Sequence, residues 1–253
     1  MRVLVAGASG AIGRPLIRQL VAAGHEVTGM TRRPERAEQI RAAGASGVVF
    51  DVFDAAALQA AVRAAAPELV INQLTSLPQR YDPRRASFFE ATDRVRSEGG
   101  RNLIEAAQVA GARRFLTQSI SFLYAPEGGW VKDEEARPFA EAPGHFGPSV
   151  RVLLDHERKV VESPDFDGLV LRYGQFYGPG TYFAREGHVG RDVRRRFPIA
   201  GPGTGMFSFV HVEDAAGVTV AASALGTRGA SNAKAKRELA WQPRYASWAP
   251  GLP

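Results

Sequence analysis

Short apolar runs alternate with longer amphipathic segments over the first 120 residues of the chain. The runs are continuously apolar, which is typical of strands buried on both faces of a parallel sheet. The longer segments place apolar residues three and four positions apart, as in Leu16, Ile17 and Leu20, which predicts helices that cover the sheet. The pattern therefore predicts an α/β fold with a doubly wound parallel sheet. Strands are expected at residues 3–6, 25–30, 48–50, 69–72, 114–118 and 167–172.

The amphipathic segments predict a helix between most consecutive strands. A further one, "FGPSVRVLLDHERKVVES", starts after a Gly-Pro pair, and Ser149 is its expected N-cap. The second half is less regular, and glycine and proline gather at 125–148 and 174–205, which predicts loops above the strand ends. Helices are expected at residues 12–23, 34–43, 55–66, 86–109, 146–163 and 187–197, and a strand followed by a helix start at 209–216.

Composition narrows the class of protein. There is no cysteine, which excludes disulfides and thiolate metal sites. No apolar run approaches the ~18 residues of a membrane span, and the apolar start is too short for a signal peptide, so we expect a cytoplasmic protein. The net charge is +6, and only four of the 32 basic residues are lysines. The arginines are spread along polar helix faces without interleaved aromatic residues, so no nucleic-acid partner is expected.

The segment "VLVAGASGAIG" places Gly7, Gly10 and Gly13 between the first strand and the first helix. The first glycine permits a tight turn, the second lets a pyrophosphate approach the backbone, and the third lets helix pack against strand. The helix N-terminus adds N–H groups and a positive dipole end. We therefore expect a dinucleotide at this loop, with Ser9 and Ile12 beside it.

The Gly-x-x-Gly-x-x-Gly spacing resembles that of the short-chain dehydrogenase/reductases, especially the extended epimerase/dehydratase branch. The segment "LRYGQFYGPG" is similar to that branch's "LRPxxVYGPG", "FVHVEDAA" to its "HVxD" segment, and "NLIEAA" to its long helix. The resemblance implies a Rossmann fold and a nicotinamide dinucleotide. It also implies cofactor contacts after the third, fourth and sixth strands, at Asp51, Val52, Asn72, Gln73, Leu74 and Tyr173.

The end of the second strand distinguishes NAD from NADP. An acidic residue there would bind the ribose 2′-hydroxyl of NAD. This chain has "GMTRRPER" instead, and the guanidinium groups of Arg32 and Arg33 suit a 2′-phosphate. We therefore expect NADP, with NAD as the alternative. The two arginines could otherwise simply cap a solvated helix start.

The resemblance also implies a catalytic set that this chain lacks. Relatives that transfer hydride use a Ser or Thr hydroxyl and a Tyr-x-x-x-Lys pair on one helix. None of the six tyrosines here has a lysine four residues later. Matching the helix at 146–163 puts Ser149 at the tyrosine position and Leu153 at the lysine position. Counting back from Tyr124 puts Ile120 at the hydroxyl position.

Four other residues are candidates to replace this set. Ser119 and Ser121 flank Ile120 and could orient the substrate oxygen, while Tyr124 or His156 could move the proton. The alternatives are a packing role for Tyr124 and a solvent-facing His156. An arginine cluster could meet an anionic substrate or form a solvated helix face. It comprises Arg191, Arg194, Arg195 and Arg196. No group of side chains has metal-ligand spacing.

These features divide the chain into a dinucleotide-binding Rossmann core at 1–165 and, at 166–253, the last core strand with a reduced substrate lobe. The last piece, "ASNAKAKRELAWQPRY", resembles the family's closing helix and "LGWxP" segment, yet it follows the preceding helix almost directly. We expect a block of the lobe to be absent and the site to be open or completed by a second subunit in a homodimer.

The function implied is that of an NAD(P)-dependent oxidoreductase or epimerase acting on a hydroxyl or carbonyl group of a small molecule, of the kind found in secondary metabolism. Because the Tyr-Lys pair is missing, two alternatives stay open. One is a non-redox isomerase, cyclase or lyase on the same fold. The other is an NADP-sensing binding protein without turnover.

Overall fold

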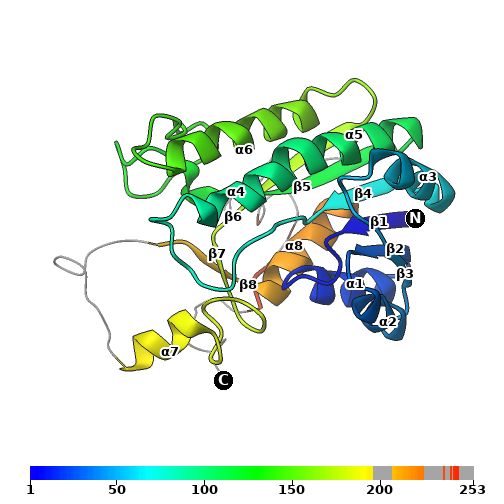
Figure 1. Cartoon of the computed structure of the whole chain (residues 1–253), viewed down its shortest axis with the longest axis horizontal. Helices are drawn as coiled ribbons and strands as arrows, with labels where there is room; N and C mark the ends of the chain where they lie inside the picture. Colours follow the sequence, from blue (N-terminus) through cyan, green and yellow to red (C-terminus); the bar gives the residue numbers. More distant parts are fainter. Residues whose placement is uncertain (196–206, 225–235, 237–239, 241, 245–253) are drawn as a thin grey trace.

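The computed structural model describes residues 1–195, 207–224, 236, 240 and 242–244. Six strands form one parallel sheet in the order β3-β2-β1-β4-β5-β6 (Figure 1). The chain therefore builds outward from β1 on one side, then returns to β4 on the other side, which confirms the doubly wound sheet. The strands are β1 (Arg2–Ala6), β2 (Glu26–Thr31), β3 (Ser46–Val49), β4 (Leu69–Asn72), β5 (Arg114–Ile120) and β6 (Asp167–Tyr173).

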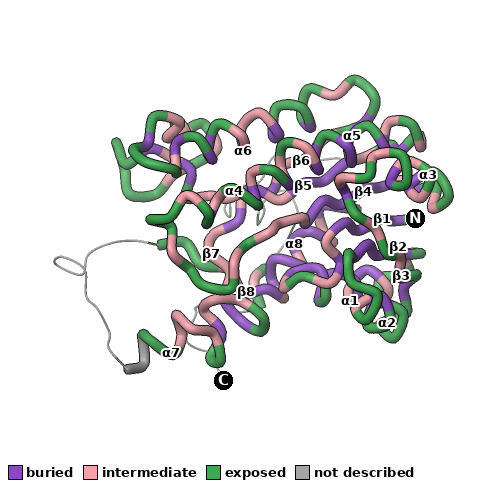
Figure 2. Tube along the Cα trace, in the orientation of Figure 1, coloured by how far each residue is buried: buried purple, intermediate pink, exposed green. Residues whose placement is uncertain are grey.

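Two helical layers enclose the sheet. One layer holds α1 (Gly13–Ala22), α2 (Pro34–Ala42) and α8 (Val212–Ala224), whose apolar side chains share a core cluster with Val3 and Val5. The other holds α3 (Ala55–Ala65), α5 (Gly100–Val109) and α6 (Phe146–Val161), which contribute to a cluster with Leu4 and Ala6. Successive residues of a strand thus enter opposite cores, and the strands are the most buried part of the molecule (Figure 2).

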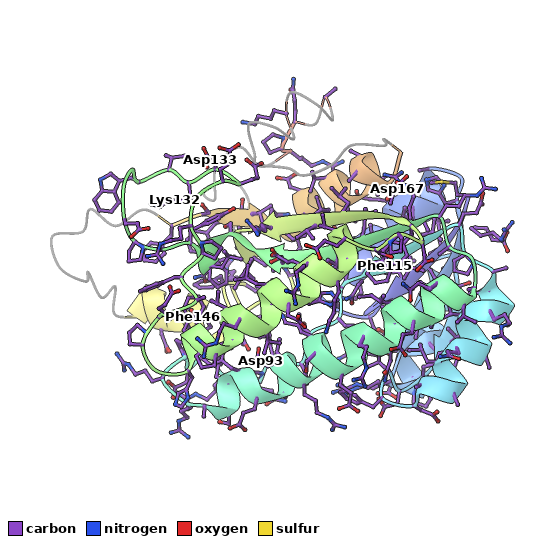
Figure 3. The ribbon with its side chains drawn as sticks, turned by 90° about the horizontal axis from the view of Figure 1, so that it is seen from above. Asp93, Phe115, Lys132, Asp133, Phe146 and Asp167 are labelled. Atoms are coloured by element: carbon purple, nitrogen blue, oxygen red, sulfur yellow. The ribbon has the colours of Figure 1, made fainter. Side chains whose placement is uncertain are left out.

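The long helix expected at 86–109 is α4 (Ser87–Arg94), a π-helical turn η1 (Val95–Gly99) and α5 in one continuous run. The backbone stays helical at both junctions, Arg94 and Gly100. A π-turn inserts one residue into a helix and leaves most apolar spacing intact, so the sequence pattern did not indicate it. Figure 3 shows α6 lying beside this run, with the labelled Asp93 and Phe146 near one end of the pair.

The remaining described elements lie at the carboxyl side of the sheet. They include a 3₁₀ turn η2 (Ser121–Leu123) after β5 and the helix α7 (His188–Arg195). The strand β7 (Gln175–Tyr177), which lies in the stretch 174–205 expected to form loops, pairs in parallel with β8 (Phe209–His211).

The boundary expected after residue 165 falls between α6 and β6, inside one continuous sheet. The helix α8 packs on α1, so part of the later segment completes a core layer. The division into two parts stays a prediction. The expected closing helix and "LGWxP"-like segment lie largely outside the described residues.

Candidate active site

A cleft of about 1050 Å³ crosses the carboxyl ends of the strands at the point between β1 and β4 where the strand order reverses. The glycine loop after β1 borders it, as do the segments that follow β2, β4 and β5. In open α/β sheets, ligands bind at this switch point. Ten of the residues expected at a dinucleotide line this cleft, namely Gly7, Ser9, Gly10, Ile12, Gly13, Arg32, Arg33, Val52, Gln73 and Leu74.

The glycine loop has no room for side chains at its two ends. Gly7 has a φ of +83°, and a Cβ there would lie 2.6 Å from the carbonyl oxygen of Gln73. A Cβ on Gly13 would lie 2.3 Å from the carbonyl oxygen of Gly7. The loop closes through a 3.0 Å bond from Gly10 N to Gly7 O. The turn from β1 into α1 is therefore one that only glycine permits at these two positions, and its residues line the cleft.

The end of β2 carries a hydroxyl where an NAD-binding site would carry a carboxylate. Thr31 is buried, and its Oγ1 lies 3.0 Å from Ser9 Oγ and accepts a 3.3 Å bond from Arg33 N. Arg36, in the first turn of α2, donates to Ser9 O at 3.1 Å and also lines the cleft. Sequence analysis missed Arg36, although it follows Arg33, the N-cap of α2, by only three residues.

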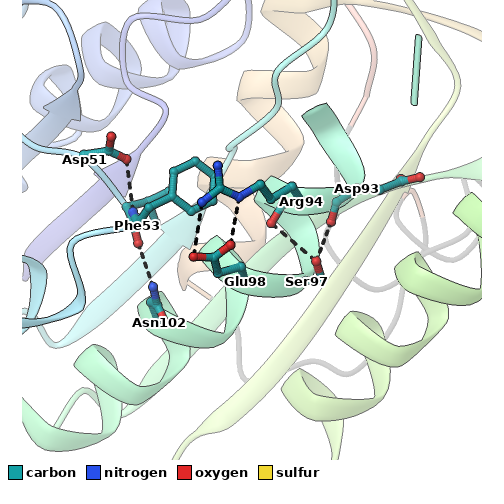
Figure 4. Close-up of polar contacts among 8 residues, drawn as sticks. Asp51, Phe53, Asp93, Arg94, Ser97, Glu98 and Asn102 are labelled. Carbon is teal, nitrogen blue, oxygen red and sulfur yellow. Dashed lines mark hydrogen bonds and ion pairs between the residues drawn. The ribbon is translucent and has the colours of Figure 1, made fainter. Parts of the chain in front are cut away.

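Asp51, predicted to contact the cofactor, is not among the residues that line the cleft. Its exposed carboxylate accepts a 3.0 Å bond from Phe53 N and does not line the cleft (Figure 4). Val52 faces the cleft instead, and its carbonyl accepts a 3.0 Å bond from Asn102 Nδ2. The Arg94 guanidinium lies 4.0 Å from the centre of the Phe53 ring and covers this turn from outside. Asp51 therefore shapes the turn that presents Val52.

Asn72 and His156 do not face the cleft either, which corrects two predictions. Asn72 Nδ2 lies 3.2 Å from both Thr117 Oγ1 and His156 Nε2, and Thr117 Oγ1 lies 2.9 Å from the same nitrogen. All three residues are buried. Burial lowers the pKa of His156 to about 4, and nearby Arg96 adds to the shift. A neutral, enclosed imidazole holds α6 against β4 and β5, so neither the proton-moving role nor the solvent-facing alternative fits.

The two serines after Thr117 point away from the cleft. Ser119 is fully buried and donates a short hydrogen bond to the Glu157 carboxylate on α6. Ser121 Oγ is buried and has no hydrogen-bond partner among the described residues. Gln118 and Ile120 line the cleft instead. Because side chains alternate along β5, Ser119 takes the face opposite to that of Gln118 and Ile120.

Tyr124 also lies outside the cleft, so its expected catalytic role is not supported. Its hydroxyl accepts a 2.9 Å bond from Arg172 Nη1, and the guanidinium lies 5.3 Å from the ring centre. Arg172 also pairs with Glu157, at 2.5 Å from Nη2 to Oε2. The packing alternative for Tyr124 is therefore the one that the structure supports.

Tyr173, expected at the cofactor, belongs to the core instead. Its hydroxyl lies 2.6 Å from Thr219 Oγ1 on α8, and burial raises its pKa. Gln73, unlike Tyr173, lines the cleft, although it is only 7% exposed. Its Oε1 has no hydrogen-bond partner among the described residues.

The helix α6 presents to the cleft Ser149, the residue that the resemblance matched to the family's tyrosine. Its Oγ donates a 2.6 Å bond to Asp93 Oδ1 on α4. Ser149 is not the N-cap, because the helix begins three residues earlier at Phe146. Leu153, at the lysine position, is fully buried. Asp93 and the cleft-lining Arg96 were missed, because only packing of α4 against α6 brings them to Ser149.

Aromatic rings form one wall of the cleft. Tyr81 makes edge-on contacts with Phe88 and Tyr182, at centroid distances of 5.3 and 5.5 Å. Phe89 continues the wall through contacts with Phe88 at 5.1 Å and with Phe146 at 6.2 Å. All five rings line the cleft. Sequence analysis missed the wall because its rings come from three separate segments of the chain.

Arg191 is the member of the expected arginine cluster that the structure places at the cleft. It lies on α7 one turn after His188, which accepts a 3.0 Å bond from Tyr81 N. The side chains of Arg194 and Arg195 are not described, and Arg196 lies outside the described residues.

Among the described residues there is neither a candidate metal site nor a candidate membrane span. They include no group of three or more His, Asp or Glu side chains that could hold a metal ion. No helix in the described part of the chain has the length and apolar character needed to cross a bilayer.

The fold and cleft define a nicotinamide-dinucleotide-dependent enzyme of the Rossmann class, and comparisons with known proteins agree. The sequence model of the NAD dependent epimerase/dehydratase family matches residues 3–233. The chain therefore belongs to this family, whose members include oxidoreductases and epimerases, as the sequence predicted. A relative from Streptomyces sp., described as a 3-diazoavenalumate denitrifying reductase, is 44% identical over 252 residues, which cover 97% of this chain and 81% of the relative.

Solved structures share the fold at low identity. A UDP-glucuronic acid 4-epimerase from Bacillus cereus, in complex with UDP-glucuronic acid and NAD, has a TM-score of 0.75 at 17% identity and covers 100% of this chain and 96% of its own. A dTDP-glucose 4,6-dehydratase from Streptomyces venezuelae, with NAD bound, has a TM-score of 0.74 at 19% identity, with coverages of 99% and 94%.

Proposed function

We propose that the protein is an NADPH-dependent reductase that removes N2 from a diazo-bearing aromatic carboxylate. The observation that carries the proposal is a mismatch within the cleft. A glycine loop of the kind that binds a dinucleotide borders the cleft, yet the resemblance matches Ile120, Ser149 and Leu153 to the family's hydroxyl, tyrosine and lysine. A carbonyl reductase needs such an acid to protonate the oxygen. A reaction in which hydride is transferred to a preformed cation does not.

Loss of N2 is such a reaction. NADPH, when bound, supplies a hydride, and a hydride plus a diazonium cation R–N2⁺ accounts for the product R–H and N2 without any proton. The relative at 44% identity is described as a denitrifying reductase of a diazo compound. That description and the missing acid–base pair agree independently.

The residues of the cleft fit the two ligands. The backbone from Gly7 to Gly13 would hold the pyrophosphate, and Arg32, Arg33 and Arg36 would hold the 2′-phosphate. NADP is therefore the cofactor that we propose. The aromatic wall favours a planar unsaturated substrate over a sugar, because aromatic faces and edges stack on one another.

Arg191 at the rim of the cleft provides a cation for the substrate's carboxylate.

A homodimer and a cytoplasmic location stay predictions.

The test follows hydrogen and nitrogen separately. The purified protein is mixed with NADPH and an arenediazonium cinnamate, and the nicotinamide absorbance, headspace N2 and the arene product are measured. With NADPH deuterated at C4, we expect one deuterium in the product and one N2 per NADPH. A no-protein reaction corrects for spontaneous reduction. If NADPH binds but is oxidised no faster than in that control, the reductase function fails and the non-redox or NADP-sensing alternatives gain support.

A further inference from the structure

A hydroxyl and a carboxylate from different helices meet in the cleft wall. Ser149 on α6 lines the cleft, and its Oγ lies 2.6 Å from Asp93 Oδ1 on α4. Ser149 is 4% exposed as a residue, and the Asp93 side chain is 21% exposed. Asp93 does not line the cleft, so its carboxylate reaches a ligand in the cleft only through the Ser149 hydroxyl, while its own exposure lets it exchange protons with solvent. Such an arrangement passes a proton between the carboxylate and a ligand through the hydroxyl.

The charged and titratable side chains near Ser149 and Asp93 come from the π-turn η1 and from α6. Arg96, on the π-turn that follows α4, lies 3.8 Å from Asp93 Oδ1. Beyond Arg96, on α6, lie the buried Glu157 and the neutral His156. Burial raises the pKa of the Asp93 carboxyl, although the Ser149 bond and Arg96 both oppose this shift. π-Turns are frequent at functional sites, and this one carries Val95 and Arg96 to the cleft.

We propose that Ser149 is a catalytic residue that exchanges a proton with the substrate, and that Asp93 is the positioning residue that supplies and recovers this proton. The Ser149 O–H bond breaks as the bond from that hydrogen to the substrate forms. For this transfer Asp93 is protonated and donates to Ser149 Oγ, the reverse of the bond that Ser149 makes to the ionised carboxylate. The Asp93 O–H bond then breaks as a new Ser149 O–H bond forms. The net change is the transfer of one proton from the Asp93 carboxyl to the substrate, and solvent then restores it.

The proposed function gives this proton a task, and the inference rests on it in that respect. A neutral diazo compound becomes a diazonium cation by gaining one proton. The cation then accepts hydride and releases N2. The pair therefore extends the substrate range from preformed diazonium cations to neutral diazo compounds, which need one proton and one hydride for each N2 released.

Two probes separate the proton step from the hydride step. One is an arenediazonium cinnamate without an ionisable ring substituent, which needs no proton. The other is a neutral quinone diazide that carries the same cinnamate side chain. For Ser149→Ala and Asp93→Asn, we expect the ratio of kcat/KM for the neutral probe to kcat/KM for the cationic probe to fall about a hundredfold or more. Ser149→Thr keeps the hydroxyl and should restore most of the loss.

A matched control is available on the same helix run. Ser97 Oγ donates a 2.8 Å bond to the backbone oxygen of Asp93, but Ser97 is exposed and does not line the cleft (Figure 4). Ser97→Ala should leave both probes unaffected. In the wild type, kcat/KM for the neutral probe should fall as pH rises through the pKa of Asp93, and this limb should be absent in Asp93→Asn. Equal losses with both probes would overturn the proposal.

A binding measurement keeps the inference testable if the proposed function is wrong. If the wild type reduces neither probe, 4-hydroxy-3-nitrocinnamate is used as a coloured ligand whose phenol titrates near neutral pH. Its bound pKa should shift between the wild type and both Ser149→Ala and Asp93→Asn, but not Ser97→Ala, when the pair faces the ligand. The same bound pKa in all four proteins would overturn the pair's role.

Discussion

Thr117 Oγ1 on β5 lies 2.9 Å from His156 Nε2 on α6, and both residues are buried. Asn72, at the end of β4, reaches the same nitrogen at 3.2 Å. A histidine that sequence reasoning placed at the reacting atoms therefore joins two strands to the helix above them. Gly100 makes room for it, since a Cβ there would lie 2.7 Å from the His156 ring.

The buried histidine predicts a loss of stability at mildly acidic pH. The folded-state pKa of His156 is about 4, below the value of 6.5 for an unperturbed histidine. Between pH 6.5 and pH 4, His156 therefore binds a proton in the unfolded chain but not in the folded chain. The stabilisation is complete above pH 6.5 and is lost as the pH falls toward 4, by about 3 kcal/mol in total.

Urea unfolding at several pH values between 4 and 7 measures this effect. His156→Gln should flatten the dependence on pH over this range, whereas His145→Gln, an exposed position at the start of the same helix, should not. An unchanged slope in His156→Gln would contradict the assignment.

Two glycines with similar backbone angles should respond differently to alanine. Gly7 and Gly24 have φ values of +83° and +79°, so a Cβ strains both backbones alike. A Cβ on Gly24 would meet no atom within 4 Å, whereas one on Gly7 would lie 2.6 Å from Gln73 O. We expect Gly24→Ala to lose about 1 kcal/mol of stability and to bind NADPH normally.

In contrast, Gly7→Ala should lose clearly more stability and weaken NADPH binding at least tenfold. Calorimetric titration and thermal unfolding of both variants provide the comparison. Equal behaviour of the two variants would show that the close approach to β4 is not what requires glycine at position 7.

The arginines after β2 should distinguish the two cofactors. Removing a guanidinium that contacts a phosphate costs about 1.5–3 kcal/mol, or about ten- to a hundredfold in Kd. Arg33→Ala and Arg36→Ala should therefore weaken NADPH binding by about this factor and leave NADH binding within about threefold. Arg63→Ala, on the exposed face of α3, is the matched control. Equal losses for NADPH and NADH would indicate that the arginines do not bind the 2′-phosphate.

The Glu157–Arg172 pair should matter for stability and not for cofactor binding. The two side chains are 8% and 20% exposed and lie outside the cleft. Breaking a buried pair leaves an uncompensated charge, so Glu157→Gln and Arg172→Met should each lose about 3–5 kcal/mol. The double variant Glu157→Leu/Arg172→Met should recover part of this loss.

Tyr124→Phe removes only one hydrogen bond to Arg172 and should lose about 1 kcal/mol with turnover unchanged. Urea unfolding curves measure the change in stability, and steady-state rates measure the turnover. A large fall in turnover for Tyr124→Phe at normal stability would restore its catalytic assignment.

Local patterns in the sequence were sufficient for the sheet, for the glycine loop, and for Arg32 and Arg33 beside the cleft. Short continuous apolar runs that alternate with amphipathic segments are typical of strands buried on both faces of a parallel sheet. Gly7 and Gly13 follow from the sharp turn that joins strand to helix. Arg33 and Arg36 lie within one helical turn, so this side of the cleft forms from residues that are near one another in the chain.

The reacting side of the cleft depends on contacts between distant segments. Ser149 meets Asp93 across 56 residues, and His156 meets Asn72 across 84. Strand alternation separates Ser119 from Ile120, but only the packing of α6 against β5 decides which of them faces the cleft. The aromatic wall likewise forms only when three separate segments of the chain come together. Tertiary packing sets these orientations, because the desolvation and steric fit that select them arise only when the layers meet.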